Sequence, residues 1–105
     1  SRGASGASVY VASKHAVEGL TKAAALEVAG TGVRVNVVAP GPVETGMLNR
    51  FTGTPENKAA LISRVPMQRI GRVEEIADAV VFLGSDKASF MTGATVAVDG
   101  GKLAR

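Results

Sequence analysis

A tyrosine and a lysine four positions apart, Tyr10 and Lys14 in the segment YVASK, are the first residues of this sequence that could carry out chemistry. On a helix, residues i and i+4 lie on one face, so the phenol and the ammonium can point into one cleft. The reference pKa of tyrosine is about 10, and a nearby cation lowers it by favouring the phenolate. The pair therefore fits a general acid/base tuned by Lys14. The same spacing fits an ordinary amphipathic helix, so the pair alone leaves both interpretations open.

A second candidate is the segment Pro40-Gly41-Pro42-Val43-Glu44-Thr45, which follows a run of β-branched residues. In open α/β sheets, ligands bind beyond the carboxyl ends of the strands. Gly41 would let the backbone approach a ligand, and Thr45 offers a hydroxyl. A purely structural turn is the alternative interpretation, because Pro-Gly marks turns in many proteins.

Two further features are interpreted as structural. Asp99-Gly100-Gly101 follows a short apolar run and predicts a turn that ends a strand. His15, the only histidine, lies beside Lys14, but neighbours on a helix point about 100° apart, so we expect a helix-surface or interface role. No cluster of His, Asp and Glu has metal-ligand spacing, and we expect no metal site.

The elements that must position these residues alternate between helices and strands. Apolar residues recur with helical spacing over residues 8–29 and 73–83, and a Thr-Pro-Glu start predicts a helix over residues 55–64. Residues 33–39 and 94–98 are typical of strands, and residues 1–7 of a loop. Strands separated by helices indicate an α/β architecture with a parallel sheet. Two strands are too few for such a sheet, so we expect preceding sequence or another copy of the chain to supply partners.

Composition excludes several classes of protein. The net charge is +3, but the basic residues are scattered, so a nucleic-acid-binding surface is not expected. No apolar run approaches the roughly 20 residues needed to span a bilayer, so we expect no membrane partner. The absence of cysteine excludes disulfides and is compatible with a reducing compartment. We expect a cytoplasmic protein.

Four segments in a fixed order carry a resemblance to a known family. They are YVASK, VRVNVVAPGPVETGM, RIGRVEEIADAVVFLGSDKASFMTG and VAVDGG. Together they resemble the short-chain dehydrogenase/reductase family from its catalytic helix to its C-terminus, over nearly all 105 residues. The resemblance implies that residues 1–105 are the C-terminal portion of one α/β domain. That portion belongs to a Rossmann-like doubly wound parallel sheet, and the N-terminal nucleotide-binding half is absent.

The resemblance also implies a function and residue roles. The parent would be an oxidoreductase that uses NAD or NADP and a small-molecule alcohol or ketone. Tyr10 would exchange a proton with the substrate, and Lys14 would lower the pKa of Tyr10 and hold the nicotinamide ribose. Residues 46–66 would form the substrate lid, and the long helix, the last helix and the last strand would join subunits of a homo-dimer or tetramer. The expected cofactor-binding residues are Tyr10, Lys14, Pro40, Gly41, Val43 and Thr45.

Some features of the family do not occur in this sequence. No glycine-rich phosphate loop follows a strand, and the family places its catalytic serine and relay asparagine upstream of the tyrosine. Two hypotheses follow. In the first, this chain is a truncated piece of an oxidoreductase and is inactive alone. In the second, it is a non-catalytic oligomerisation or assembly module derived from the dehydrogenase fold.

Overall fold

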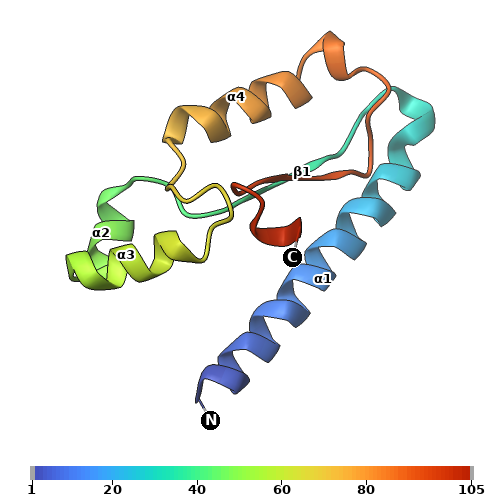
Figure 1. Ribbon diagram of the computed structural model, residues 1–105. Helices are drawn as coiled ribbons and strands as arrows, with labels where there is room; N and C mark the ends of the chain where they lie inside the picture. Colours follow the sequence, from blue (N-terminus) through green and yellow to red (C-terminus); the bar gives the residue numbers. More distant parts are fainter. Residues whose placement is uncertain (1, 105) are drawn as a thin grey trace. The chain divides into compact units, whose positions relative to one another are not determined.

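The computed structural model describes residues 2–104, with side chains from Val11 onward, and it contains two compact units. The first unit combines the chain up to Val37 with Ser89–Thr95, and the second combines Val38–Ala88 with the chain from Val96. In chain order the elements are α1 (Arg2–Val28), η1 (Ala29–Thr31), β1 (Val37–Pro40), α2 (Gly46–Thr52), α3 (Pro55–Ser63), α4 (Val73–Leu83), η2 (Asp86–Ala88), β2 (Thr95–Val98) and η3 (Lys102–Ala104) (Figure 1).

The first unit is dominated by the long helix α1. It begins at Arg2, so residues 2–7 are helical and the predicted loop there is wrong. Extending an existing helix adds one hydrogen bond for each residue fixed, which offsets the cost of the glycines in this stretch. At the other end the chain passes through η1 to Gly32, whose φ of 87° gives the left-handed conformation expected after a helix. The helix ends at Val28, so the C-terminal bound of the helix predicted over residues 8–29 is confirmed to within one residue.

The strands β1 and β2 pair in a two-stranded sheet. The Val37 N–H donates to the Ala94 carbonyl at 2.9 Å, and the Gly41 N–H donates to the Val98 carbonyl at 3.0 Å. The residue offset is the same in both bonds, which is the register of parallel strands. The predicted parallel pairing is therefore confirmed.

The first strand is shorter than the predicted residues 33–39, because side chains take the place of the ladder before Val37. The Asn36 side chain accepts from the Ala94 N–H at 3.1 Å and donates to the Met91 carbonyl at 2.9 Å. The Val35 N–H donates to the Thr92 hydroxyl at 3.0 Å. Asn36 thus ties β1 to the segment that enters β2.

In the second unit, two short helices begin at threonine caps. The Thr45 hydroxyl accepts from the Leu48 N–H at 3.0 Å at the start of α2, and the Thr54 hydroxyl accepts from the Asn57 N–H at 3.1 Å at the start of α3. Pro55 is the first residue of α3, as the Thr-Pro-Glu pattern predicts. The helices α2 and α3 lie side by side (Figure 1).

The helix α4 has the predicted bounds, but most of its predicted apolar face is not covered. Leu83 is 8% exposed, whereas Val80 and Val81 are 53% and 70% exposed. Ala77 is also exposed, and Ile76 is half-buried. An apolar stripe on a helix is buried only where another element packs on it. In the described part of the chain, only part of this face is packed.

No helix among residues 2–104 combines the length and the apolar character required to cross a bilayer.

The close approach of β1 and β2 at Gly41 leads to a test of stability. A Cβ on Gly41 would lie 2.7 Å from the Asp99 Cα and 2.8 Å from its Cβ. Gly41→Ala should therefore lower the free energy of unfolding by about 1–3 kcal/mol, measured by urea denaturation. The control is Gly19→Ala on α1, where a Cβ meets nothing within 4 Å and alanine should be neutral or stabilising. Equal stability of Gly41→Ala and wild type would show that the strands separate without cost.

Candidate active site

The loop from Pro40 to Thr45 is held by backbone hydrogen bonds on two sides. On one side, the Gly41 N–H donates to the Val98 carbonyl at 3.0 Å. On the other side, the Gly71 N–H donates to the Pro42 carbonyl at 2.9 Å, and the Glu44 N–H donates to the Gly71 carbonyl at 2.9 Å. These bonds fix the loop backbone directly after β1, at the carboxyl end of the strand, where ligands bind in open α/β sheets.

The backbone of Val43 is left open by this arrangement. Val43 and Gly71 form an isolated parallel bridge, and its two bonds use the residues on either side of Val43. In a parallel bridge of this kind, the N–H and C=O of the central residue point away from the partner strand. Neither group of Val43 has a hydrogen-bond partner in the described part of the chain. The loop therefore presents one free donor and one free acceptor side by side.

Thr45 adds a hydroxyl to this edge. The hydroxyl accepts from the Leu48 N–H, so its oxygen lone pairs are partly used, but its own proton remains available. Thr45 is half-buried. A ligand oxygen could accept this proton without disturbing the cap of α2.

Glu44 connects the loop to the two short helices. Its Oε1 accepts from the Lys58 Nζ at 2.9 Å and from the Asn49 Nδ2 at 3.2 Å, and Lys58 also donates to the Asn49 Oδ1 at 2.9 Å. The Lys58 and Asn49 hydrogen bonds lower the pKa of the Glu44 carboxyl. The charge of Glu44 is therefore used to hold α2 and α3 rather than left free for a ligand.

Glu75 at the start of α4 binds the segment on both sides of Gly71. Its carboxylate accepts from Arg69 through Nη1 at 2.8 Å and Nη2 at 2.9 Å, and its Oε1 also accepts from the Arg72 N–H at 2.9 Å. The Arg69 hydrogen bonds, followed by the Arg72 N–H, lower the pKa of Glu75 from 4.5 to about 2. The same contact raises the pKa of Arg69.

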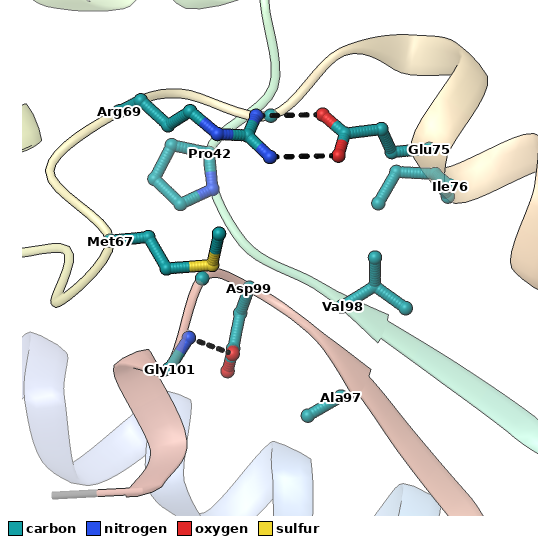
Figure 2. A pocket seen from close by; sticks show the side chains of 11 residues that line it. Pro42, Met67, Arg69, Glu75, Ile76, Ala97, Val98, Asp99 and Gly101 are labelled. Carbon is teal, nitrogen blue, oxygen red and sulfur yellow. Dashed lines mark hydrogen bonds and ion pairs between the residues drawn. The ribbon is translucent and has the colours of Figure 1, made fainter.

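A cavity of about 400 Å³ lies beside this ion pair in the second unit. Figure 2 shows the Arg69–Glu75 ion pair on the same side of the cavity as Pro42. Asp99 and Gly101 lie on the opposite side. Asp99 is also engaged, because its carboxylate accepts from the Gly101 N–H at 2.9 Å and the Leu103 N–H at 3.0 Å. The predicted turn at Asp99 is thus confirmed. The charged groups that line the cavity are all partnered, so the cavity itself offers no free acid or base.

The residues predicted from the sequence fall in both units. Tyr10 and Lys14 belong to α1 in the first unit, and Pro40, Gly41, Val43 and Thr45 lie in the second. The backbone of Tyr10 is helical, its side chain lies outside the described residues, and Lys14 is half-buried one turn further along. His15 is exposed and its ring contacts the Val11 carbonyl at 3.0 Å. Among the described residues no group of three or more acidic or histidine side chains could hold a metal ion.

The ion pair of Arg69 with Glu75 was missed by the sequence analysis. Glu74 and Glu75 fit the acids expected at a helix start, and Glu75 does bind the Arg72 N–H there. However, six positions separate Arg69 from Glu75, and the two are joined through an irregular segment. Neither the helical period nor the strand period places residues six positions apart next to each other. The signal that could have predicted the pair is therefore the segment RIGRVEE taken as a whole.

Comparison with known proteins gives one consistent family. Residues 1–102 match a family model described as enoyl-(acyl carrier protein) reductase. Galactitol 2-dehydrogenase of Cereibacter sphaeroides is 52% identical over 95 residues, and 3-oxoacyl-[acyl-carrier-protein] reductase of Thermotoga maritima is 45% identical over 93 residues. A structure from Agrobacterium tumefaciens with bound NADP matches with a TM-score of 0.83 at 45% identity, over 91% of this chain.

The chain belongs to the short-chain dehydrogenase/reductase family. The matches cover 90% and 88% of this chain but only 37% of the length of each of the two relatives, and 39% of the solved chain. The Rossmann-like α/β fold class inferred from the four sequence segments is confirmed by these neighbours.

The lowered pKa of Glu75 predicts how its contribution to stability depends on pH. A carboxyl whose pKa is lower in the folded state stabilises the fold above its unfolded pKa, and this contribution is lost as the pH falls through the folded pKa. Wild type should therefore melt at a higher temperature than Glu75→Gln near neutral pH. The difference should shrink below about pH 4.5 and vanish near pH 2.

Thermal melts of both proteins across this range measure the effect, with Glu74→Gln as the control for losing one acid from the first turn of α4. A difference that stays constant down to the acid limit would mean that Glu75 is not held ionised by Arg69 and the Arg72 N–H.

Proposed function

We propose that this chain is part of a longer NAD(P)-dependent oxidoreductase that moves a hydride between nicotinamide and an alcohol or ketone, with Tyr10 as the general acid/base. The observation that carries the proposal is the spacing of Tyr10 and Lys14 on the continuous helix α1, in a chain of this family. The solved relative with bound NADP supports the cofactor class, and the length of the relatives supports a longer parent.

The loop after β1 fits a nicotinamide carboxamide. A carboxamide has two N–H donors and one carbonyl acceptor. The free Val43 C=O can accept from the amide nitrogen, and the Val43 N–H can donate to its oxygen. The remaining Thr45 proton is a further donor on the same loop. Pro40 and Gly41 would add backbone close to the ring.

In the proposed reaction, the residues of the protein carry out the proton transfer. When bound, the nicotinamide ring supplies or accepts the hydride. In reduction, the Tyr10 phenol donates its proton to the carbonyl oxygen of the substrate, and in oxidation the phenolate accepts the hydroxyl proton. In this proposal Lys14, one helical turn away, would stabilise the phenolate and so lower the pKa of Tyr10. Lys14 would also donate to the ribose hydroxyls.

Residues 46–66, which contain α2 and α3, are the proposed substrate lid. Met47 and Phe51 are exposed apolar side chains on α2, which suits the apolar part of an organic substrate. The relatives are named for galactitol and for a 3-oxoacyl-[acyl-carrier-protein], so small alcohols and ketones define the substrate class to test first. The cytoplasmic location and the homo-oligomeric state stay predictions.

A second candidate function is assembly without catalysis. It is favoured by large apolar side chains that are exposed among the described residues, including Leu20, Leu26, Val81 and Phe90. Exposed apolar groups of this size are typical of surfaces that bind another chain. This candidate predicts a stable oligomer that does not bind NADH or NADPH. Light scattering and nucleotide titration of the expressed protein separate it from the enzyme.

The first prediction for the enzyme concerns Tyr10. In the longer protein, Tyr10→Phe should lower kcat by roughly 10²–10⁴-fold and leave nucleotide affinity largely unchanged, because phenylalanine keeps the ring but has no proton to exchange. Two assays measure it: NADPH or NADH consumption with simple ketones and 3-oxoacyl thioesters, and NADPH or NADH formation from the oxidised nucleotide with polyols. Lys14→Gln should also impair turnover. Lys22→Gln on the same helix is its control, and unchanged turnover in Tyr10→Phe would reject the role of Tyr10.

The second prediction concerns Thr45, for which the chain offers a matched control. Thr45→Ala and Thr54→Ala each remove a threonine cap of the same geometry, so each should cost about 1 kcal/mol of stability. Only Thr45→Ala should also weaken NADPH or NADH binding, because only Thr45 lies on the proposed cofactor loop. Fluorescence titration measures the dissociation constants. Equal affinities for the two variants would limit Thr45 to its capping role.

A further inference from the structure

Gly71 connects the proposed cofactor loop to the start of α4. Its N–H and C=O bind Pro42 and Glu44, which are the neighbours of Val43 on each side. A Cβ on Gly71 would lie 3.4 Å from the Val43 Cγ1, so the two segments are already in close contact there. A shift of Gly71 would therefore move the Val43 N–H and C=O with it.

The position of Gly71 is in turn set by one carboxylate. Glu75 binds the Arg69 guanidinium through two oxygens and the Arg72 N–H through one, so it holds the residues on both sides of Gly71. A bidentate contact of this kind fixes orientation as well as distance. The Arg69 Nη1 also donates to the Ile70 carbonyl at 3.3 Å, which closes the segment on itself. Figure 2 shows the Arg69–Glu75 contact next to Pro42 of the loop.

We propose that Glu75 is a positioning residue for nucleotide binding, because it holds residues 69–72 in place and Gly71 within them fixes the backbone of Pro42–Glu44. Glu75 does not touch the nucleotide in this scheme. It acts through Arg69, the Arg72 N–H and Gly71 on the two free backbone groups of Val43. This inference rests on the proposed function, since it assumes that the loop binds the nicotinamide.

The test compares Glu75→Gln with Glu74→Gln in the longer protein. Glutamine at position 75 has one acceptor oxygen, so it cannot bind both Arg69 nitrogens and the Arg72 N–H as the carboxylate does. Glu74 is the adjacent exposed acid and makes no ion pair in the part of the chain that the structure describes. The dissociation constants of NADPH and NADH, the KM for the nucleotide, kcat and the melting temperature are measured for each variant.

We expect the dissociation constant and the KM for the nucleotide to rise roughly tenfold in Glu75→Gln and to stay at the wild-type value in Glu74→Gln. A purely structural role would lower the melting temperature of Glu75→Gln without changing the affinity of the folded protein. Wild-type affinity in folded Glu75→Gln would therefore overturn the proposal. If wild type itself binds neither nucleotide, the proposed function fails, and the two failures are thus distinguishable.

A milder variant covers the case in which Glu75→Gln does not fold. Arg69→Gln removes the ion pair but leaves the Glu75 carboxylate on the Arg72 N–H, so part of the constraint on Gly71 remains. Nucleotide affinity should then fall severalfold, by less than in Glu75→Gln. The double variant should lose less than the sum of the single effects, because both residues act through one contact. Unchanged affinity in Arg69→Gln, or fully additive losses, would overturn the proposal.

Discussion

The backbone pairing of residues 41–44 between Val98 and Gly71 is the constraint on which the candidate site depends. This pairing holds the loop beyond β1, which contains two prolines and a glycine, in one backbone conformation. The prolines suit this role because each has a restricted φ and no N–H that would need a partner. Gly41 permits the close approach to Asp99, and the open backbone groups of Val43 are a direct consequence of the bridge to Gly71.

The carboxylates around this loop maintain structure and are not available to react. Glu44 binds Lys58 and Asn49, Glu75 binds Arg69 and the Arg72 N–H, and Asp99 binds two backbone N–H groups. The pKa values of Glu44 and Glu75 are lowered by their partners, which makes both carboxylates poor general bases near neutral pH. The groups that remain free are the backbone of Val43 and the hydroxyl proton of Thr45, which can recognise a ligand but cannot exchange a proton at neutral pH. In the proposed function the acid/base must therefore come from elsewhere, and the proposal assigns this role to Tyr10 with Lys14.

Local features of this fold could be predicted from the sequence, and features that depend on distant residues could not. The threonine-proline start of α3 and the bounds of α4 follow from neighbouring residues, because caps and helical periods are local interactions. The early start of α1 and the role of Asn36 in place of the strand ladder were not predicted. Asn36 bonds to residues 91 and 94, and nothing within a few positions of it indicates such partners. The Arg69–Glu75 pair was missed for the same reason, and the tyrosine, lysine and Val43–Thr45 roles came from family resemblance rather than from a local rule.

The helix α4 carries more apolar side chains than the other described residues cover. Glu74 and Asp78 are exposed, while Ile76 and Leu83 are half-buried and buried, so one part of the helix is already packed. Val80 and Val81 carry the predicted apolar character but stay largely exposed, at 53% and 70%, among the described residues. Covering a valine side chain is worth about 1.5–3 kcal/mol, so such a surface favours any element that can pack on it. Further strands and helices of a longer chain would do so within one domain, and a second copy would do so between chains. The two candidate functions therefore make the same use of this face and differ at the loop after β1, where free backbone groups recognise a nucleotide in the first and have no role in the second.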